Sequence, residues 1–310
     1  AGTVVLQYLD LNGNGVGIDA TNTERLILSF ARVTGSVSYG LDILDTESVN
    51  IVDSSFENNG GPGDSSIRFR ADTQGDYGLY LSNNTITDAS AAAIAISTIG
   101  LGDNSSLALQ IYESEITTAQ FGADAVQMVW NGPVFAALVG NSFVGTGGSN
   151  TGVDITTTST SELVQLTVSQ NTFAFDGGDD VGMSFTTLGP ATLFADQNTI
   201  DFDGAGGTGI NFALAESAVA YVYENVITDN VSGGTGILFS SMDGPSTATI
   251  YSNTIDLLSP TSVIDRGIIF TSITDSVTLQ GGNDNTVTGA TTSFFAPIGA
   301  INGAILLTVA

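Results

Sequence analysis

A short motif of asparagine, a variable residue and an aliphatic or aromatic residue recurs along the whole chain. Its clearest copies begin at positions 84, 141, 171, 198, 225, 253 and 285, and degenerate copies begin at Ala31, Ser54 and Ser114. Successive copies are 23 to 32 residues apart. A period of this length predicts a solenoid, in which each repeat forms one turn that stacks on the next.

A second pattern, a small residue followed by an aliphatic one, repeats with the same period, as at Gly182-Met183 and Gly209-Ile210. Around both patterns apolar residues alternate with polar ones, which is the period of a β-strand, and helical spacing is absent. Glycine-rich joints between these strands absorb the variation in repeat length. We therefore expect residues 1–310 to form one all-β domain, a single-stranded parallel β-helix of about eleven or twelve coils. Crossover chirality predicts that it is right-handed.

The charge of the chain excludes several chemistries. Its 310 residues include 32 acidic and 5 basic side chains and no histidine or cysteine, for a net charge of −27. The basic residues are all arginines, so lysine, histidine and thiol catalysis are excluded. Such a charge repels nucleic acid and anionic lipid surfaces. No apolar run approaches the roughly 18 to 20 residues of a membrane-spanning helix.

The asparagine column predicts a ladder of stacked side chains at one turn of the coil, because asparagine tolerates left-handed backbone geometry and its amide can bond to the equivalent residue above and below. The predicted ladder residues are Asn84, Asn141, Asn171, Asn198, Asn225, Asn253 and Asn285. On these residues the chain resembles the right-handed parallel β-helix repeat proteins of the pectin-lyase-like superfamily, of the large secreted or surface kind. That superfamily includes polysaccharide lyases, glycosidases, tailspikes and surface proteins, so the resemblance leaves the activity open.

Two acidic stretches are candidates for calcium binding. The first is a cluster of turn acids on two consecutive repeats, made of Asp176, Asp179, Asp180, Asp201 and Asp203. The second begins at Asp10 and matches the first half of a calcium loop, but Thr21 stands where that loop needs a bidentate carboxylate. The alternatives for the cluster are solvated turn acids or a catalytic carboxylate pair, against which stands the absence of histidine and lysine.

Arg68 and Arg70 alternate with Ile67 and Phe69, so both guanidinium groups should point outward from one strand. A lyase base is one interpretation of this pair. The other is ion pairing with turn acids such as Asp72 or Asp76.

Aromatic residues recur at outward positions just before the asparagine column, and we expect them on one face of one sheet. There they would stack on sugar rings, pack against a neighbouring chain, or simply reflect β-propensity. These residues are Tyr80, Tyr112, Phe194, Tyr221, Tyr223 and Tyr251.

Both ends of the sequence are apolar and lack a helical capping pattern. We expect the strand near Val4 to Tyr8 of one molecule to lie against the strand near Ile305 to Val309 of another. The leading hypothesis is a non-enzymatic structural protein of a prokaryotic extracellular surface, either a filament subunit or a module of an adhesin or matrix protein. A polysaccharide lyase or hydrolase and a carbohydrate-binding β-helix are the alternatives.

Overall fold

The computed structural model describes residues 2–89, 91–98, 105–257, 265–272, 277–281, 285–295, 301–302 and 307–309. Its strands form three parallel sheets of 12, 12 and 11 strands, and no helix occurs in these ranges. Consecutive strands of the chain belong to different sheets, so each turn of the coil contributes one strand to each sheet. At the usual spacing of parallel strands, 12 strands extend about 55 Å along the axis.

The first sheet contains β1 (Thr3–Gln7), β4 (Arg25–Ser29), β7 (Ser48–Val52), β10 (Asp76–Ser82), β13 (Ser106–Tyr112), β16 (Val134–Val139), β19 (Val164–Ser169), β22 (Ala191–Asp196), β25 (Ala218–Tyr223), β28 (Ser246–Tyr251), β31 (Val277–Gly281) and β34 (Ile301–Asn302). The second sheet contains β2 (Asp10–Asn12), β5 (Arg32–Thr34), β8 (Ser55–Glu57), β11 (Thr85–Ala89), β14 (Glu115–Thr118), β17 (Ser142–Gly145), β20 (Thr172–Phe175), β23 (Thr199–Phe202), β26 (Val226–Asp229), β29 (Thr254–Leu257), β32 (Asn285–Thr288) and β35 (Leu307–Val309). The third sheet contains β3 (Ile18–Thr21), β6 (Leu41–Leu44), β9 (Ile67–Ala71), β12 (Ile94–Thr98), β15 (Asp124–Trp130), β18 (Thr151–Thr157), β21 (Val181–Thr187), β24 (Thr208–Leu214), β27 (Thr235–Met242), β30 (Arg266–Phe270) and β33 (Thr292–Phe295).

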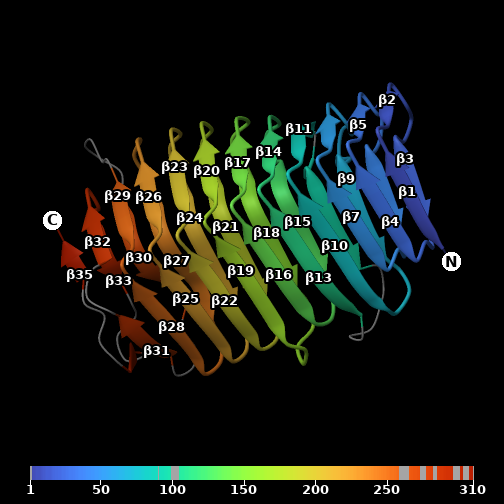
Figure 1. The fold of residues 1–310 in the computed structure, drawn as a ribbon. Coiled ribbons are helices and arrows are strands. Elements are labelled where there is room, and N and C mark those ends of the chain that lie inside the picture. Colours follow the sequence, from blue (N-terminus) through green and yellow to red (C-terminus); the bar gives the residue numbers. More distant parts are fainter. Residues whose placement is uncertain are drawn as a thin grey trace.

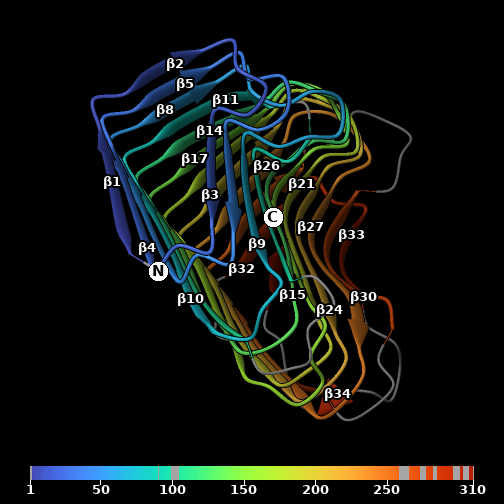
Figure 2. The same ribbon diagram turned by 90° about the vertical axis from the view of Figure 1, so that its right-hand side faces the viewer.

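The sheets run side by side along a rod, with the N-terminus at one end and the C-terminus at the other (Figure 1). Figure 2 looks along the rod from its N-terminal end, where the chain rises along β1, crosses along β2 and descends along β3. This sense is clockwise as the chain recedes from the viewer, so the coil is right-handed. The predicted fold class is confirmed.

The core consists of columns of apolar side chains that stack from turn to turn. Leu26, Val49 and Leu79 are in register in the first sheet and are 1% exposed. In the third sheet, rings stack in a column whose centroids are 4.4 to 5.4 Å apart. The members of that column are Phe185, Phe212, Phe239 and Phe270.

Small residues recur where the third sheet begins because neighbouring turns approach closely there. A Cβ atom added to Gly209 would lie 2.4 Å from the carbonyl oxygen of Gly236 and 2.8 Å from Cδ1 of Ile227. Either contact is shorter than a Cβ atom tolerates, so a side chain at this position would push two turns apart.

The asparagine ladder is also confirmed, and it extends to the degenerate copies. The backbone N–H of Asn171 donates to Oδ1 of Asn198, and the same bond links successive copies from Asn141 to Asn285, at 2.9 to 3.1 Å. Ser54 and Ser114 take the same place, because each hydroxyl oxygen accepts the N–H of the preceding copy at 3.2 Å. A ladder of buried hydrogen bonds therefore runs from Ala31 to Asn285.

Candidate functional site

The residue before each ladder position from Ala31 to Asn253, and Tyr8 one turn earlier, form a column of outward corners between the first and second sheets. At successive turns this corner residue has a φ of 48° to 58°, or 69° at Gly140, which is the left-handed region. Most corner residues are polar or glycine, as such geometry favours. Tyr8 and Phe30 are the exceptions, with φ values of 55° and 53°.

These two aromatic corner residues face solvent. The Tyr8 side chain is 79% exposed and that of Phe30 is 49% exposed. Their rings are stacked, with centroids 5.1 Å apart and planes 6° apart. Left-handed geometry is uncommon for bulky side chains, and solvent exposure means that core packing does not require them here.

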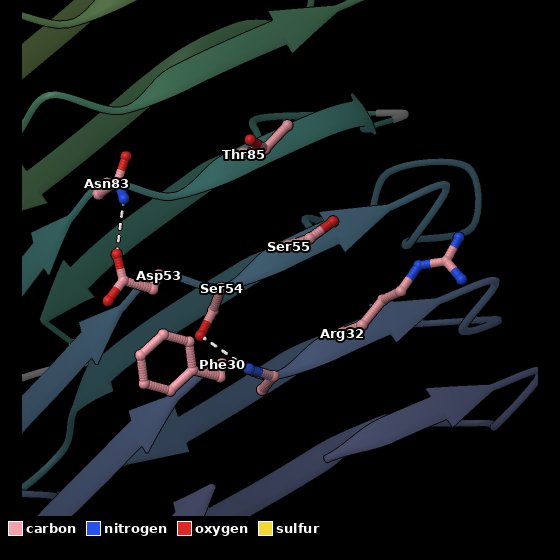
Figure 3. A pocket seen from close by; sticks show the side chains of 8 residues that line it. Phe30, Arg32, Asp53, Ser54, Ser55, Asn83 and Thr85 are labelled. Carbon is pink, nitrogen blue, oxygen red and sulfur yellow. Dashed lines mark hydrogen bonds between the residues drawn. The ribbon is translucent and has the colours of Figure 1, made fainter. Parts of the chain in front are cut away.

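A surface hollow of about 470 Å³ begins at Phe30 and continues over the next two turns. One rim is the corner column, where Asp53 and Asn83 follow Phe30, and the other is the second sheet (Figure 3). Nδ2 of Asn83 donates to Oδ1 of Asp53 at 2.6 Å. On the second sheet, the lining residue Arg32 has its Nη2 atom 3.1 Å from Oε2 of Glu57, which does not itself line the hollow. The remaining lining residues are Ala31, Ser54, Ser55 and Thr85.

The six aromatic residues predicted for one sheet face lie on five strands of the first sheet, β10, β13, β22, β25 and β28, and all are half-buried. Tyr80 and Tyr112 have ring centroids 5.9 Å apart. Three turns further on, two pairs stack face to face with centroids 4.8 and 5.0 Å apart. These two pairs are Phe194 with Tyr221 and Tyr223 with Tyr251.

The structure divides the five acids predicted for calcium between one hollow and its surroundings, where burial raises the pKa of Asp180 and the charges of Asp176 and Asp179 add to the shift. Asp176, Asp201 and Asp203 line one small hollow of about 110 Å³. Nδ2 of Asn230 donates to both Asp201 and Asp203, at 3.1 and 2.8 Å. Burial raises the pKa of Asp201, and the nearby Asp203 carboxylate adds to the shift.

The other two acids of the cluster lie outside that hollow. Asp180 is fully buried, and its Oδ1 accepts the backbone N–H of Asn150 at 2.7 Å. Asp179 is a turn residue with a φ of 58°. Among the described residues no group of three acids is arranged to hold a metal ion, so calcium at this cluster stays a prediction.

The other calcium candidate has the wrong local structure. Asp10 and Asn12 belong to the extended strand β2, whereas a calcium loop wraps its ligands around one centre. The match in sequence letters therefore does not correspond to such a loop in the structure.

The expected ion pairs of Arg68 and Arg70 with Asp72 or Asp76 are wrong. Both arginines contact Asp42, which lies directly beside Arg68 on the neighbouring strand. The Arg68 guanidinium forms two hydrogen bonds to the Asp42 carboxylate, at 2.9 and 2.6 Å, and stacks 3.6 Å over the Tyr39 ring. This arrangement leaves neither arginine placed as a free catalytic base.

Sequence reasoning missed two buried acids. Asp229 is 1% exposed, and burial raises its pKa to about 6, with the charges of Asp265 and Asp201 adding to the shift. Asp265 is fully buried, and its Oδ1 accepts the N–H groups of Gly233 and Gly234. The Oδ2 atoms of both acids have no hydrogen-bond partner within the described part of the chain.

It also missed a pair of carboxyl groups on the outer face of the third sheet. Burial raises the pKa of Asp124 to about 6, with the Asp154 carboxylate on the next strand adding to the shift. Burial also raises the pKa of Asp154. Nε2 of Gln127, which is in register with Asp154, donates to Oδ2 of Asp124 at 2.8 Å.

Comparisons with known proteins do not assign a function, since no family model, curated protein or solved structure matches the chain. Within the described ranges, no helix has the length and apolar character needed to cross a membrane.

Proposed function

We propose that this protein is a structural, non-enzymatic β-solenoid of a prokaryotic extracellular surface and that its molecules associate end to end. The observation that carries the proposal is the open first layer of the core. Val4 is in register with Leu26 and therefore belongs to an inward column. Leu26 is 1% exposed, whereas Val4 is 41% exposed because no turn of the described chain covers it.

The backbone at both ends of the rod supports the same arrangement. β1, β2 and β3 are the edge strands at one end of the three sheets, and β34, β35 and β33 are the edge strands at the other. Edge strands present unpaired N–H and C=O groups to a further strand. A second copy offers three parallel strands in the same order, so its terminal turn is the complementary occupant.

Such a contact joins two different surfaces and repeats without closing, which produces a fibre. The pairing expected from the sequence brings Val4 to Tyr8 against Ile305 to Val309. Of the latter segment, Leu307–Val309 form β35, and residues 305 and 306 lie outside the described residues. The stacked aromatic pairs on the first sheet would then serve lateral contacts between rods.

Composition and architecture support the rest of the proposal. Only five arginines and no lysine leave few sites for trypsin-like proteases, which suits an exposed filament, adhesin or matrix protein. Three parallel sheets with an asparagine ladder support kinship with the pectin-lyase-like superfamily.

The test compares two neighbouring valines of β1 by sedimentation velocity and electron microscopy at micromolar concentration. Val4→Asp places a charge on the open core layer and should leave monomers. Val5→Asp is the matched control, since Val5 points outward, is already 52% exposed and should not prevent assembly. Wild-type protein that stays monomeric with ordered terminal turns would contradict the proposal.

A second candidate function is polysaccharide hydrolysis at Asp124 and Asp154. Asp124, with a pKa of about 6, lies beside a second carboxyl group, that of Asp154. In glycoside hydrolases, one carboxyl group of such a pair has a raised pKa and acts as the general acid, while the other acts as a carboxylate. Release of reducing ends from neutral polysaccharides that is lost in both Asp124→Asn and Asp154→Asn would favour this function. Absence of any release by the wild-type protein would exclude it for the substrates tried.

A further inference from the structure

The stacked pair at the corner is placed to extend a stack. Tyr8 covers one face of the Phe30 ring, with the planes 6° apart. The hollow lies on the side of Phe30 away from Tyr8, where the next two turns place Asp53 and Asn83 in the corner column (Figure 3). Aspartate and asparagine are shorter than phenylalanine, so the outer part of the Phe30 ring has no neighbour of equal length on that side.

The polar groups beside this ring retain bonding capacity. The Asp53–Asn83 bond uses one carboxylate oxygen and one amide nitrogen, which leaves the second oxygen of Asp53 and the amide oxygen of Asn83 as acceptors. Across the hollow, the Arg32–Glu57 pair uses one terminal nitrogen of the guanidinium. The Arg32 side chain points away from Phe30 and Asp53 (Figure 3), so the acceptors beside the ring are those of Asp53 and Asn83. A flat aromatic surface beside free polar acceptors is the chemistry of a site for an amphipathic ring.

We propose that this corner hollow binds a neutral saccharide, with one pyranose ring stacked on Phe30 and its hydroxyl groups bonded to Asp53 and Asn83. A pyranose has an apolar C–H face and hydroxyl groups around its edge, which matches the two kinds of surface. The net charge of −27 disfavours an anionic sugar.

The corner is better suited to a sugar than the aromatic face of the first sheet. In that face the rings of Phe194 and Tyr221 cover each other, as do those of Tyr223 and Tyr251, with planes only 8° and 3° apart. All four side chains are also more buried than that of Phe30, which is 49% exposed and borders a hollow. Phe30 is also a bulky residue in left-handed geometry at an exposed position, which core packing does not require.

The test measures binding of cellohexaose, mannohexaose and xylohexaose, with hexagalacturonate as the anionic comparison, by saturation-transfer NMR and calorimetry. Phe30→Asn keeps a residue that tolerates left-handed geometry but removes the ring, and Asp53→Gly removes the carboxylate in the same way. We expect each to weaken binding of a neutral hexasaccharide about tenfold, which is the effect of one such contact. Circular dichroism should show an unchanged fold.

Phe121→Asn is the matched control, because Phe121 is 79% exposed at a different corner. It should leave binding unchanged. Val4→Asp should also leave binding unchanged, so the saccharide site and end-to-end association can fail separately. The proposal is overturned if none of the neutral probes binds, if only hexagalacturonate binds, or if Phe30→Asn binds as the wild type does.

Discussion

Asn198 lies in the middle of the ladder, and its replacement by alanine measures what one rung contributes. Its Oδ1 accepts both the backbone N–H and the side-chain Nδ2 of Asn171, at 3.0 Å each. Its Nδ2 donates to the carbonyl oxygen of Val168 at 2.8 Å and to Oδ1 of Asn225 at 3.0 Å. The side chain is 1% exposed, so water does not replace these bonds.

The expected cost follows from which groups keep a partner. Nδ2 of Asn171 retains its bond to Leu138, and Oδ1 of Asn225 retains the N–H of residue 198. The backbone N–H of Asn171 loses its acceptor, which costs about 1–3 kcal/mol. Each of the two donations lost with Nδ2 of Asn198 costs about 1 kcal/mol more. Asn198→Ala should therefore lower the free energy of unfolding by about 4 kcal/mol.

Serine at the same position should cost about half as much, because the chain already uses it twice. The hydroxyls of Ser54 and Ser114 accept the N–H of the preceding copy and donate to a carbonyl two residues back, at 2.9 Å. Urea unfolding followed by circular dichroism, with hydrogen exchange of the peptide that contains Asn171, checks the order wild type, Ser, Ala. Gln197→Asn is the control, since Gln197 is exposed and its side chain bonds to the exposed Gln170 and Glu224. If alanine and serine variants unfold like the wild type, the ladder does not stabilise the coil.

Three further predictions concern charge. Burial raises the pKa of Asp229 from the ordinary 3.8 to about 6, so the folded protein holds this proton more tightly than the unfolded chain does. The resulting stabilisation is complete below pH 3.8 and is lost as the pH rises through about 6, so the free energy of unfolding should fall between pH 4 and pH 7. For Asp229 alone the difference corresponds to about 3 kcal/mol, and Asp229→Asn should reduce the fall by that amount while exposed Asp19→Asn does not. Ile227→Asp, at a fully buried core position, should cost more than about 3 kcal/mol, whereas Val226→Asp beside it, 41% exposed, should cost less than about 1 kcal/mol; equal melting curves would refute the register. The calcium site predicted from the sequence at Asp176, Asp179, Asp180, Asp201 and Asp203 requires a higher melting temperature in calcium than in chelator at matched ionic strength, and identical curves would exclude a specific site.

The repeat pattern predicts most of the fold. A constant step between columns identifies which residues stack, and alternation identifies which of them point inward, so Leu26, Val49 and Leu79 were assignable without coordinates. Ser54 and Ser114 were recognisable as ladder members because they occupy the column, although neither is an amide. Their function in the ladder depends on a hydroxyl being able to accept the same backbone N–H.

The incorrect ion pairs show where sequence proximity misleads. Asp72 and Asp76 are only two and six residues from Arg70 along the chain, but a solenoid brings together residues one repeat apart. The step from Gly40-Leu41 to Ser66-Ile67 already places Asp42 beside Arg68. The repeat spacing also predicts that Asp229 is buried. It is in register with Phe202 and, one turn earlier, Phe175, which form an inward column of the second sheet.

The repeat pattern does not predict the corner hollow, because the depth of the hollow depends on unequal side-chain lengths at equivalent positions of successive turns. Each turn from Tyr8 to Ser252 holds one corner residue in left-handed geometry, which costs on the order of 1 kcal/mol for a non-glycine residue. Where the adjacent ladder residue is asparagine, its several buried hydrogen bonds offset that cost. Beside Phe30 the ladder position is Ala31, whose backbone N–H donates to Oγ of Ser54. The fold thus fixes the backbone and leaves the corner side chains free to vary. The fold does not require the exposed rings of Tyr8 and Phe30, nor the short polar side chains of Asp53 and Asn83 that follow them. For that reason the corner is where we expect a ligand to bind.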